Sequence, residues 1–252
     1  MADISDEFKG KVVVVTGASR GIGKSIALAF ARKGATIVVA ARSETQGKHE
    51  GTIHQTADEI RALGAEAFPL KVDVTSEDDI AEMFRKVDEK YGRIDVMVNN
   101  VGTVLPGTIA ELPTRKWHLS LAINLNSVFL CSKEAIGFMK RQGGGTIINL
   151  SSAVGRSIIL GTVQYMTAKA AVSRFTEALA AEVRGDNITV NALAPERTAT
   201  PGQMLAESET EGLQDPEMWA DYAVFLARQS VDTLTGRVLE ANDVPPLLAK
   251  LG

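Results

Sequence analysis

The sequence predicts an α/β fold in which helices cover both faces of a parallel sheet. Short runs that are apolar at nearly every position alternate with longer stretches of helical periodicity along the 252 residues. A strand that is apolar throughout is buried on both sides, as in parallel sheets, and the intervening helices supply the crossovers. Because such crossovers are right-handed, the strands form a doubly wound, Rossmann-like sheet whose ligands bind beyond the carboxyl ends of the strands.

The predicted strands and helices alternate over most of the chain. Gly34 and Gly64 close the first two helices, since glycine is the usual residue after a helix end. The fourth helical stretch is expected to be one long helix capped at Thr114, whereas residues 42–51 and 197–215 have no regular pattern. The expected strands are 12–15, 36–40, 67–72, 94–98, 146–150, 188–192 and 237–240, and the expected helices are 22–33, 53–63, 77–91, 114–139, 164–184 and 217–228.

Length and composition favour a single domain that covers residues 1–252. A hydrophobic content of 45% is enough for one buried core, and no linker rich in proline, serine or charge divides the chain. The net charge of −4 does not favour nucleic acid, and no apolar run approaches the ~18 residues of a membrane-spanning helix. Cys131 is the single cysteine, which excludes an internal disulfide framework. With the acidic start MADISDEFKG, it favours a cytoplasmic location.

The stretch GASRGIG, residues 17–23, lies between the first strand and the first helix and carries glycines at positions 17, 21 and 23. Glycine allows a tight turn and a close backbone approach, and the following helix N-terminus offers free N–H groups to a pyrophosphate. Glycine turns also follow strands for purely structural reasons. The position directly after the first strand favours a dinucleotide, with contacts from Gly17, Ser19, Arg20, Gly21, Ile22 and Gly23.

The residues after the second strand predict which dinucleotide binds. An acidic residue there would bond the ribose 2′-hydroxyl of NAD, whereas a cation would pair with the 2′-phosphate of NADP. This chain has Ala41, then Arg42 and Ser43, so we expect Arg42 and Arg20 to hold the phosphate with Ser43 adding a hydroxyl. The alternative is two solvated surface arginines. NADP(H) is therefore expected over NAD(H); Lys48 could also reach the phosphate, although a solvated lysine is the simpler interpretation.

Two further strand ends carry candidate cofactor contacts. Asp73 and Val74 follow the third strand, where the carboxylate can accept from an adenine amino group; Thr75 or Ser76 is expected to cap the next helix. After the fourth strand comes NNVG, residues 99–102. There the asparagines, Asn100 among them, can tie strand ends together, and Gly102 leaves space for the cofactor.

The fifth strand ends at Ser151 and Ser152, and the helix after it contains YMTAK. Tyr165 and Lys169 are four positions apart and therefore lie on one helix face. A lysine beside a phenol favours the phenolate and is expected to lower the tyrosine pKa, so that the tyrosine can transfer a proton near neutral pH. Tyrosine and lysine at this spacing are common, so this pair alone is a weak signal.

Taken together, these motifs resemble the short-chain dehydrogenase/reductase family over roughly residues 10–240. The matching motifs are TGASRGIG, DV at 73–74, NNVG, the asparagine in AINLNSVF, SSAVG, YMTAK and VNALAP, in the family's order. The resemblance implies a Rossmann-type fold with a seven-stranded parallel sheet, a homo-oligomer (tetramer or dimer), and hydride transfer between the nicotinamide and a carbonyl or alcohol carbon.

The resemblance also assigns roles to four residues. Tyr165 would be the general acid/base, Lys169 would hold the nicotinamide ribose and depress the tyrosine pKa, and Ser152 would bond the substrate oxygen. Asn124 would hold a water that links the lysine to solvent. Ser151 competes with Ser152, but the 13 positions between 152 and 165 favour Ser152. Pro195 and Thr198, after the sixth strand, are further expected cofactor contacts.

Within the family, the glycine-loop arginine resembles the NADP-preferring branch, and the long loop before GTIH resembles a hydroxysteroid dehydrogenase-like subgroup. The chain departs from the family pattern at Glu196, where a glycine is usual, and in the tail, which lacks a Gly-Gly pair. The substrate lid, expected at about 197–215, is short. Thr200 matches a further family threonine.

The expected substrate is a small, apolar carbonyl or alcohol compound, because the expected pocket walls are mostly apolar. These walls are Val104, Leu105, residues 154–160 with Arg156 as the exception, Met204 and Leu205. The histidines His49, His54 and His118 lack carboxylate or cysteine partners at metal spacing, so no metal is expected. The sequence thus predicts an NADP(H)-dependent oxidoreductase. The alternatives are a cofactor-binding sensor or scaffold with little turnover and an epimerase or dehydratase of the same fold.

Overall fold

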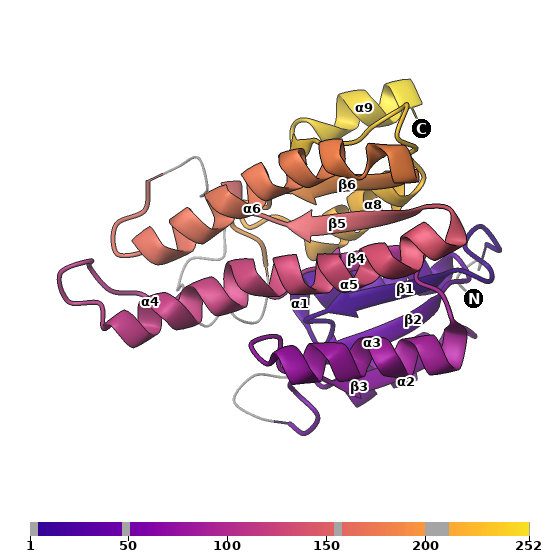
Figure 1. Cartoon of the computed structure of the whole chain (residues 1–252), viewed down its shortest axis with the longest axis horizontal. Helices are drawn as coiled ribbons and strands as arrows, with labels where there is room; N and C mark the ends of the chain where they lie inside the picture. Colours follow the sequence, from indigo (N-terminus) through magenta and orange to yellow (C-terminus); the bar gives the residue numbers. More distant parts are fainter. Residues whose placement is uncertain (1–4, 47–50, 154–157, 200–211, 252) are drawn as a thin grey trace.

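A computed structural model of the chain describes residues 5–46, 51–153, 158–199 and 212–251. Figure 1 shows one twisted sheet between two layers of helices. The strands are β1 (Val12–Thr16), β2 (Thr36–Ala41), β3 (Ala67–Lys71), β4 (Val96–Asn99), β5 (Gly145–Leu150), β6 (Ile188–Leu193) and β7 (Val238–Leu239). All pair in parallel in the order β3-β2-β1-β4-β5-β6-β7, which confirms the seven-stranded doubly wound sheet.

The main helices are α1 (Gly21–Arg32), α2 (Ile53–Ala62), α3 (Glu77–Tyr91), α4 (Thr114–Leu121), α5 (Ser127–Gln142), α6 (Val163–Glu182), α8 (Pro216–Ala227) and α9 (Val244–Leu251). Short turns of other helix types lie at Ala122–Asn126 and Arg184–Asp186. No helix in the described ranges is long and apolar enough to cross a membrane.

Two hydrophobic cores lie on the two faces of the sheet, and strand alternation divides β1 between them. Val13 and Val15 belong to the core under α1, α2, α8 and α9, whereas Val12 and Val14 belong to the core under α3, α5 and α6. Cys131 is buried in the second core, as expected for a small apolar residue, and burial raises the pKa of its thiol to about 12.

The predicted long helix from residue 114 is confirmed as one continuous helical run through α4 and α5, but it contains a π-helical turn at Ala122–Asn126 that the sequence did not predict. Thr114 is not the cap but the first helical residue, since Pro113 takes the N-cap position with an extended backbone. The tail forms α9, for which the sequence analysis made no prediction; Pro245 and Pro246 lie in its first turn, where proline is tolerated.

Candidate active site

The glycine-rich turn after β1 packs directly against the side chain of Asn100. Gly17 and Gly21 have positive φ angles of 68° and 54°, which favour glycine. A Cβ on Gly17 would lie 2.8 Å from the Asn100 side-chain nitrogen, and one on Gly23 only 2.3 Å away. Asn100 Nδ2 donates to the carbonyls of Thr16 and Gly17, at 3.0 and 3.3 Å. Asn100, directly after β4, therefore fixes the conformation of this turn.

Arg20 turns outward from the glycine turn toward the end of β2. Its guanidinium donates to Ser43 Oγ at 2.5 Å and to the Gly51 carbonyl at 3.4 Å. Burial lowers the pKa of Arg20, and the nearby charge of Arg42 lowers it further. Arg42 itself faces Asp73 at 3.8 Å. The structure thus brings together Arg20, Arg42 and Ser43, as the sequence predicted, and adds the Arg42–Asp73 contact, which was not predicted; Lys48 lies outside the described residues.

The other residues predicted to contact the adenosine part of the cofactor are Ser19, Ile22, Val74 and Asp73. Ser19 and Val74 are buried, and half-buried Ile22 packs on the core beneath α1. Asp73 Oδ1 accepts from the Thr75 amide and hydroxyl, at 2.9 and 2.8 Å. Of the two expected caps of α3, Ser76 is the one observed, since its hydroxyl accepts from the Asp79 amide.

A ladder of buried side-chain hydrogen bonds ties the strand ends together below the site. Asn99 Nδ2 donates to Asn149 Oδ1 at 2.9 Å and to Ser132 Oγ at 3.0 Å. Asn149 in turn donates to Thr176 Oγ1 at 2.9 Å. The ladder links β4, β5, α5 and α6, which confirms that the asparagines after the fourth strand connect neighbouring elements.

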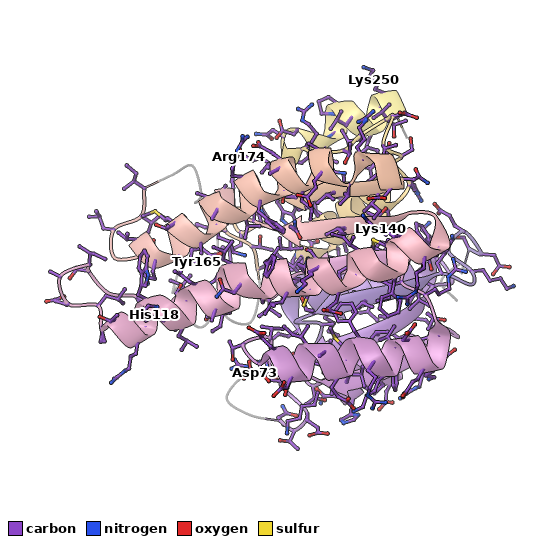
Figure 2. The ribbon with its side chains drawn as sticks, in the orientation of Figure 1. Asp73, His118, Lys140, Tyr165, Arg174 and Lys250 are labelled. Carbon is purple, nitrogen blue, oxygen red and sulfur yellow. The ribbon has the colours of Figure 1, made fainter. Side chains whose placement is uncertain are left out.

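Tyr165 and Lys169 lie on one face of α6, beside the end of β5, as their spacing predicted. Figure 2 shows Tyr165 and Asp73 toward the end of the molecule at which the β5 arrowhead lies. Lys169 is buried, its ammonium lies 5.8 Å from the centre of the Tyr165 ring, and it donates to the Leu150 carbonyl at 2.6 Å. Burial lowers the pKa of Lys169 to about 8.

The expected direction of the tyrosine shift is wrong in this structure. Burial raises the pKa of the Tyr165 hydroxyl, and the hydrogen bond with Ser152 opposes that shift without reversing it. The physical reason is that burial disfavours the charged phenolate, while the Lys169 ammonium donates to the Leu150 carbonyl and not to the phenol oxygen. The phenol is therefore held in its protonated form at neutral pH.

The two serines at the end of β5 point to different partners. Buried Ser151 is committed to α6, with its hydroxyl 3.0 Å from the Lys169 carbonyl and 2.7 Å from Ser173 Oγ. Ser152 is half-buried, donates to the Pro195 carbonyl at 3.1 Å and bonds with Tyr165. This geometry favours Ser152 over Ser151 as the residue that reaches a substrate.

Asn124 lies in the π-helix between α4 and α5, and π-helical turns are frequent at functional sites. Its side chain is fully engaged, because Nδ2 donates to the carbonyls of Thr103 and Ser120 and Oδ1 accepts from the Thr103 amide, each at 2.9 Å. Gly102 lies between this amide and Lys169: a Cβ there would be 3.2 Å from both Asn124 Oδ1 and Lys169 Nζ. A side chain at position 102 would fill the space beside the lysine.

The segment after β6 contributes Pro195 and Thr198. The Pro195 carbonyl accepts from Ser152, as above, and from the Ala153 amide at 3.0 Å. Thr198 is buried and its hydroxyl bonds the Glu196 carbonyl at 3.2 Å. Several expected residues lie outside the described residues, namely Thr200, Met204, Leu205, Arg156 and His49.

Gln164, directly before Tyr165, is a residue that the sequence interpretation missed. It is completely buried, donates to the Leu105 carbonyl, and leaves its own Oε1 without a hydrogen-bond partner. A polar residue next to a candidate catalytic tyrosine was the available signal. Gln164 thus joins the start of α6 to the loop between β4 and α4. That loop also contacts the loop before α6, because the Gly107 amide donates to the Gly161 carbonyl at 2.9 Å.

Large exposed apolar side chains surround this junction of loops. Six of the eight exposed large hydrophobic residues in the described part of the chain belong to these loops or to the start of α6: Val104, Ile109, Ile158, Ile159, Leu160 and Val163. Ile158 and Leu160 are 86% and 92% exposed, which is unusual for side chains of this kind unless they contact something else.

The glycine turn at the end of β1 and the serine, tyrosine and lysine after β5 lie at the carboxyl ends of the strands, where the sequence predicts the cofactor and the reaction. The family model described as short chain dehydrogenase matches residues 11–211. The chain therefore belongs to the short-chain dehydrogenase/reductase family, whose members transfer hydride between a nicotinamide and an alcohol or carbonyl group.

Among curated proteins, the chain is 34% identical over 242 residues to a 3-oxoacyl-[acyl-carrier-protein] reductase of Thermotoga maritima, covering 92% of this chain and 96% of that one. It is 34% identical over 226 residues to a 3beta-hydroxysteroid dehydrogenase of Mediterraneibacter gnavus, covering 86% and 79%. A solved short-chain type dehydrogenase/reductase from Mycobacterium marinum superposes with a TM-score of 0.84 at 33% identity, covering 93% and 96%. A 7 alpha-hydroxysteroid dehydrogenase complexed with NADH and 7-oxo glycochenodeoxycholic acid gives 0.83 at 28%, covering 95% and 94%.

Proposed function

We propose that the protein is an NADP(H)-dependent oxidoreductase that interconverts an apolar ketone or aldehyde with the corresponding alcohol. The observation that carries the chemistry is the convergence of Ser152, Tyr165 and Lys169 at the carboxyl end of β5, where Tyr165 and Ser152 share a hydrogen bond. The bound cofactor supplies or accepts the hydride. The residues of this chain then have to orient the substrate oxygen and move one proton.

Tyr165 is the proposed proton donor in the reducing direction. Its raised pKa keeps the hydroxyl protonated at neutral pH, so it can donate to an oxygen that gains negative charge as hydride arrives. Ser152, which bonds Tyr165, would donate to the same oxygen once its hydroxyl proton turns from the Pro195 carbonyl to the substrate. Lys169, charged below its pKa of about 8, stabilises the phenolate that remains. In the oxidising direction the same groups act in reverse.

The cofactor preference rests on Arg20 and Arg42. Burial and then the charge of Arg42 both lower the pKa of Arg20, and Ser43 adds a hydroxyl beside the Arg20 guanidinium. A dianionic 2′-phosphate would relieve the repulsion between the two arginines, whereas the 2′-hydroxyl of NAD would not. Because a structural relative is described with NADH, family membership alone does not decide the cofactor.

The substrate class rests on the exposed apolar side chains of the two loops beside Tyr165. They favour a substrate with an apolar body, and two relatives are named for oxoacyl and hydroxysteroid compounds. We further propose that residues 1–252 form one domain with a substrate lid at about 197–215, and that the protein is a cytoplasmic homo-oligomer, a tetramer or a dimer.

A spectrophotometric screen of ketones, aldehydes and alcohols with NADPH and NADH tests this function. We expect turnover of apolar carbonyl compounds with at least a tenfold preference for NADPH. In Tyr165→Phe we expect turnover to fall by about 10³-fold, within the range for loss of a general acid, with the Kd for NADPH unchanged. Tight NADPH binding without turnover of any compound would instead indicate a sensor or scaffold.

A further inference from the structure

The segment after β6 carries Glu196 at a position where the family pattern has glycine. Glu196 is exposed, yet both its backbone and its side chain are held. Its amide donates to Gln214 Oε1 at 3.2 Å, and its carboxylate accepts from Gln214 Nε2 at 3.5 Å. The partner of the unusual glutamate is thus one glutamine, 18 positions further along the chain.

Gln214 joins three parts of the structure. Its backbone amide donates to the Arg197 carbonyl at 2.8 Å, and its carbonyl accepts from the Ala199 amide at 2.9 Å. Its side-chain Oε1 also accepts from the indole nitrogen of Trp219 at 3.2 Å. Trp219 is completely buried in α8. Gln214 is therefore fixed to the core through Trp219 and bonds the segment Glu196–Ala199, after β6, through its other hydrogen bonds.

The segment after β6 also contacts the candidate active site. Pro195, directly before Glu196, supplies the carbonyl that accepts from Ser152 Oγ and from the Ala153 amide. Thr198, the expected contact of the nicotinamide end of the cofactor, lies between the two residues whose backbones Gln214 holds. A shift of a few tenths of an ångström in this segment would move both the serine partner and the cofactor contact.

We propose that Gln214 is a positioning residue for the reaction, and that Glu196 replaces glycine here because its carboxylate completes the grip of Gln214 on the Pro195–Ala199 segment. Glycine would allow more backbone freedom at this position. The backbone amide of residue 196 would bond Gln214 Oε1 with glycine as well, so the glutamate adds one contact, its carboxylate to Gln214 Nε2, on a side chain that Trp219 already holds. This inference rests on the proposed function, since it assigns a role toward Ser152 and the cofactor.

The experiment uses one loss variant, one repulsion variant and one restored pair. Gln214→Leu removes the side-chain bonds. Gln214→Glu places a second carboxylate against Glu196, whereas Gln214→Glu with Glu196→Gln returns one amide and one carboxylate with the roles exchanged. We expect both single variants to lose about tenfold in kcat and to raise the KM for NADPH about threefold, corresponding to loss of one or two hydrogen bonds. The restored pair should recover to within threefold of the wild type.

Gln229→Leu is the matched control, because Gln229 is another half-buried glutamine whose side-chain amide bonds a backbone carbonyl, that of Phe225, away from the site. It should leave both kinetic constants unchanged. A purely structural Gln214 would lower the Tm without changing kcat or KM per folded molecule, and absence of recovery in the restored pair would likewise overturn the proposal.

The Kd for NADPH and for NADH, measured by fluorescence in the absence of substrate, separates this inference from the proposed function. If no carbonyl compound is turned over, the proposed function fails, and the positioning role of Gln214 is then tested by the cofactor Kd alone. It survives if Gln214→Glu weakens cofactor binding and the restored pair recovers it. It fails if the wild type is active and both single variants match it in every constant.

Discussion

The two ends of the sheet treat their charged and polar groups in opposite ways. At the amino ends of the strands, Asp95 precedes β4 with its side chain only 11% exposed, and accepts from Lys11 at 3.1 Å, from Arg93 at 2.6 Å and from the Val12 amide at 2.9 Å. Gln142, beside it, satisfies both the amide and the carbonyl of Ile94. A hollow of about 320 Å³ lies among these residues, yet its buried carboxylate is already fully paired.

At the carboxyl ends, Arg42 and Asp73 still form a pair, but three other polar groups in the described ranges lack such partners. Among the described residues, buried Lys169 bonds a backbone carbonyl and has no carboxylate, Arg20 has an arginine nearby instead of an acid, and Gln164 keeps a buried oxygen unbonded. Leaving buried polar groups unpaired costs stability. The comparison teaches that one end of the sheet is arranged to hold the fold, while the other retains unsatisfied groups that a cofactor and substrate can engage.

The largest effect that would test this comparison is expected at Lys169. In Lys169→Met we expect kcat/KM to fall by about 10³-fold, while the free energy of unfolding is unchanged or higher, because a buried ammonium without a carboxylate is removed. Steady-state kinetics and urea unfolding measure the two. A variant that unfolds more easily and keeps its activity would contradict the functional assignment.

The pH dependence of stability sharpens the same point. The pKa of Lys169 is about 8 when folded and about 10.4 when unfolded, so between these values the unfolded chain holds more protons. The stability of the wild type relative to Lys169→Met should therefore rise as pH increases from about 8 to 10. An unchanged difference over that range would mean that the lysine is not desolvated.

The next effect separates the two adjacent serines. Ser152→Ala removes a donor to the substrate oxygen and should lower kcat by about 10²-fold, the usual scale for such a donor. Ser151→Ala is the matched control and should change kcat by less than about threefold, since Ser151 bonds α6. Kinetics of both variants with one substrate decide the matter. Equal losses would show that the choice of Ser152 is wrong.

At the opposite end, Asp95→Asn should affect stability and spare activity. Removing one partner of this nearly buried ion cluster is expected to lower the free energy of unfolding by about 2–3 kcal/mol at pH 7. Burial raises the pKa of Asp95, but the bonds from Arg93, the Val12 amide and Lys11 together outweigh it and lower the pKa. The stabilisation is therefore present above the unfolded pKa and disappears as pH falls through the lower, folded value. Urea unfolding at pH 7 and pH 3 should therefore show a shrinking difference. A kcat change above twofold per folded molecule would break the comparison.

The smallest expected effect is at Arg20. Arg20→Ala should raise the Kd for NADPH about tenfold, equivalent to ~1.4 kcal/mol for a charged hydrogen bond, and the Kd for NADH less than threefold. Lys24→Ala is a matched control, because Lys24 lies in the first turn of α1, which begins directly after Arg20, but pairs with Glu59. Equal weakening of both cofactors would remove the basis for the NADP preference.

Much of this fold could be predicted from the sequence because its signals are local. Apolar strands and glycine helix ends placed most elements within two residues, and motif order identified the family. The π-helix at 122–126 was missed, because one widened turn barely alters helical periodicity. The raised pKa of Tyr165 and the links made by Asn100 and Gln214 depend on packing between distant segments, which no short pattern records.

The contact between Asn100 and the glycines has a consequence for protein engineering. The frame of the nucleotide turn is held from below by Asn100, whereas Arg20 extends to Ser43 and Gly51 at the rim. Redesign of cofactor choice can therefore be confined to the rim residues, with the three glycines and their asparagine left as a fixed scaffold. Libraries that vary Arg20, Arg42 and Ser43 together would explore specificity while the turn itself stays intact.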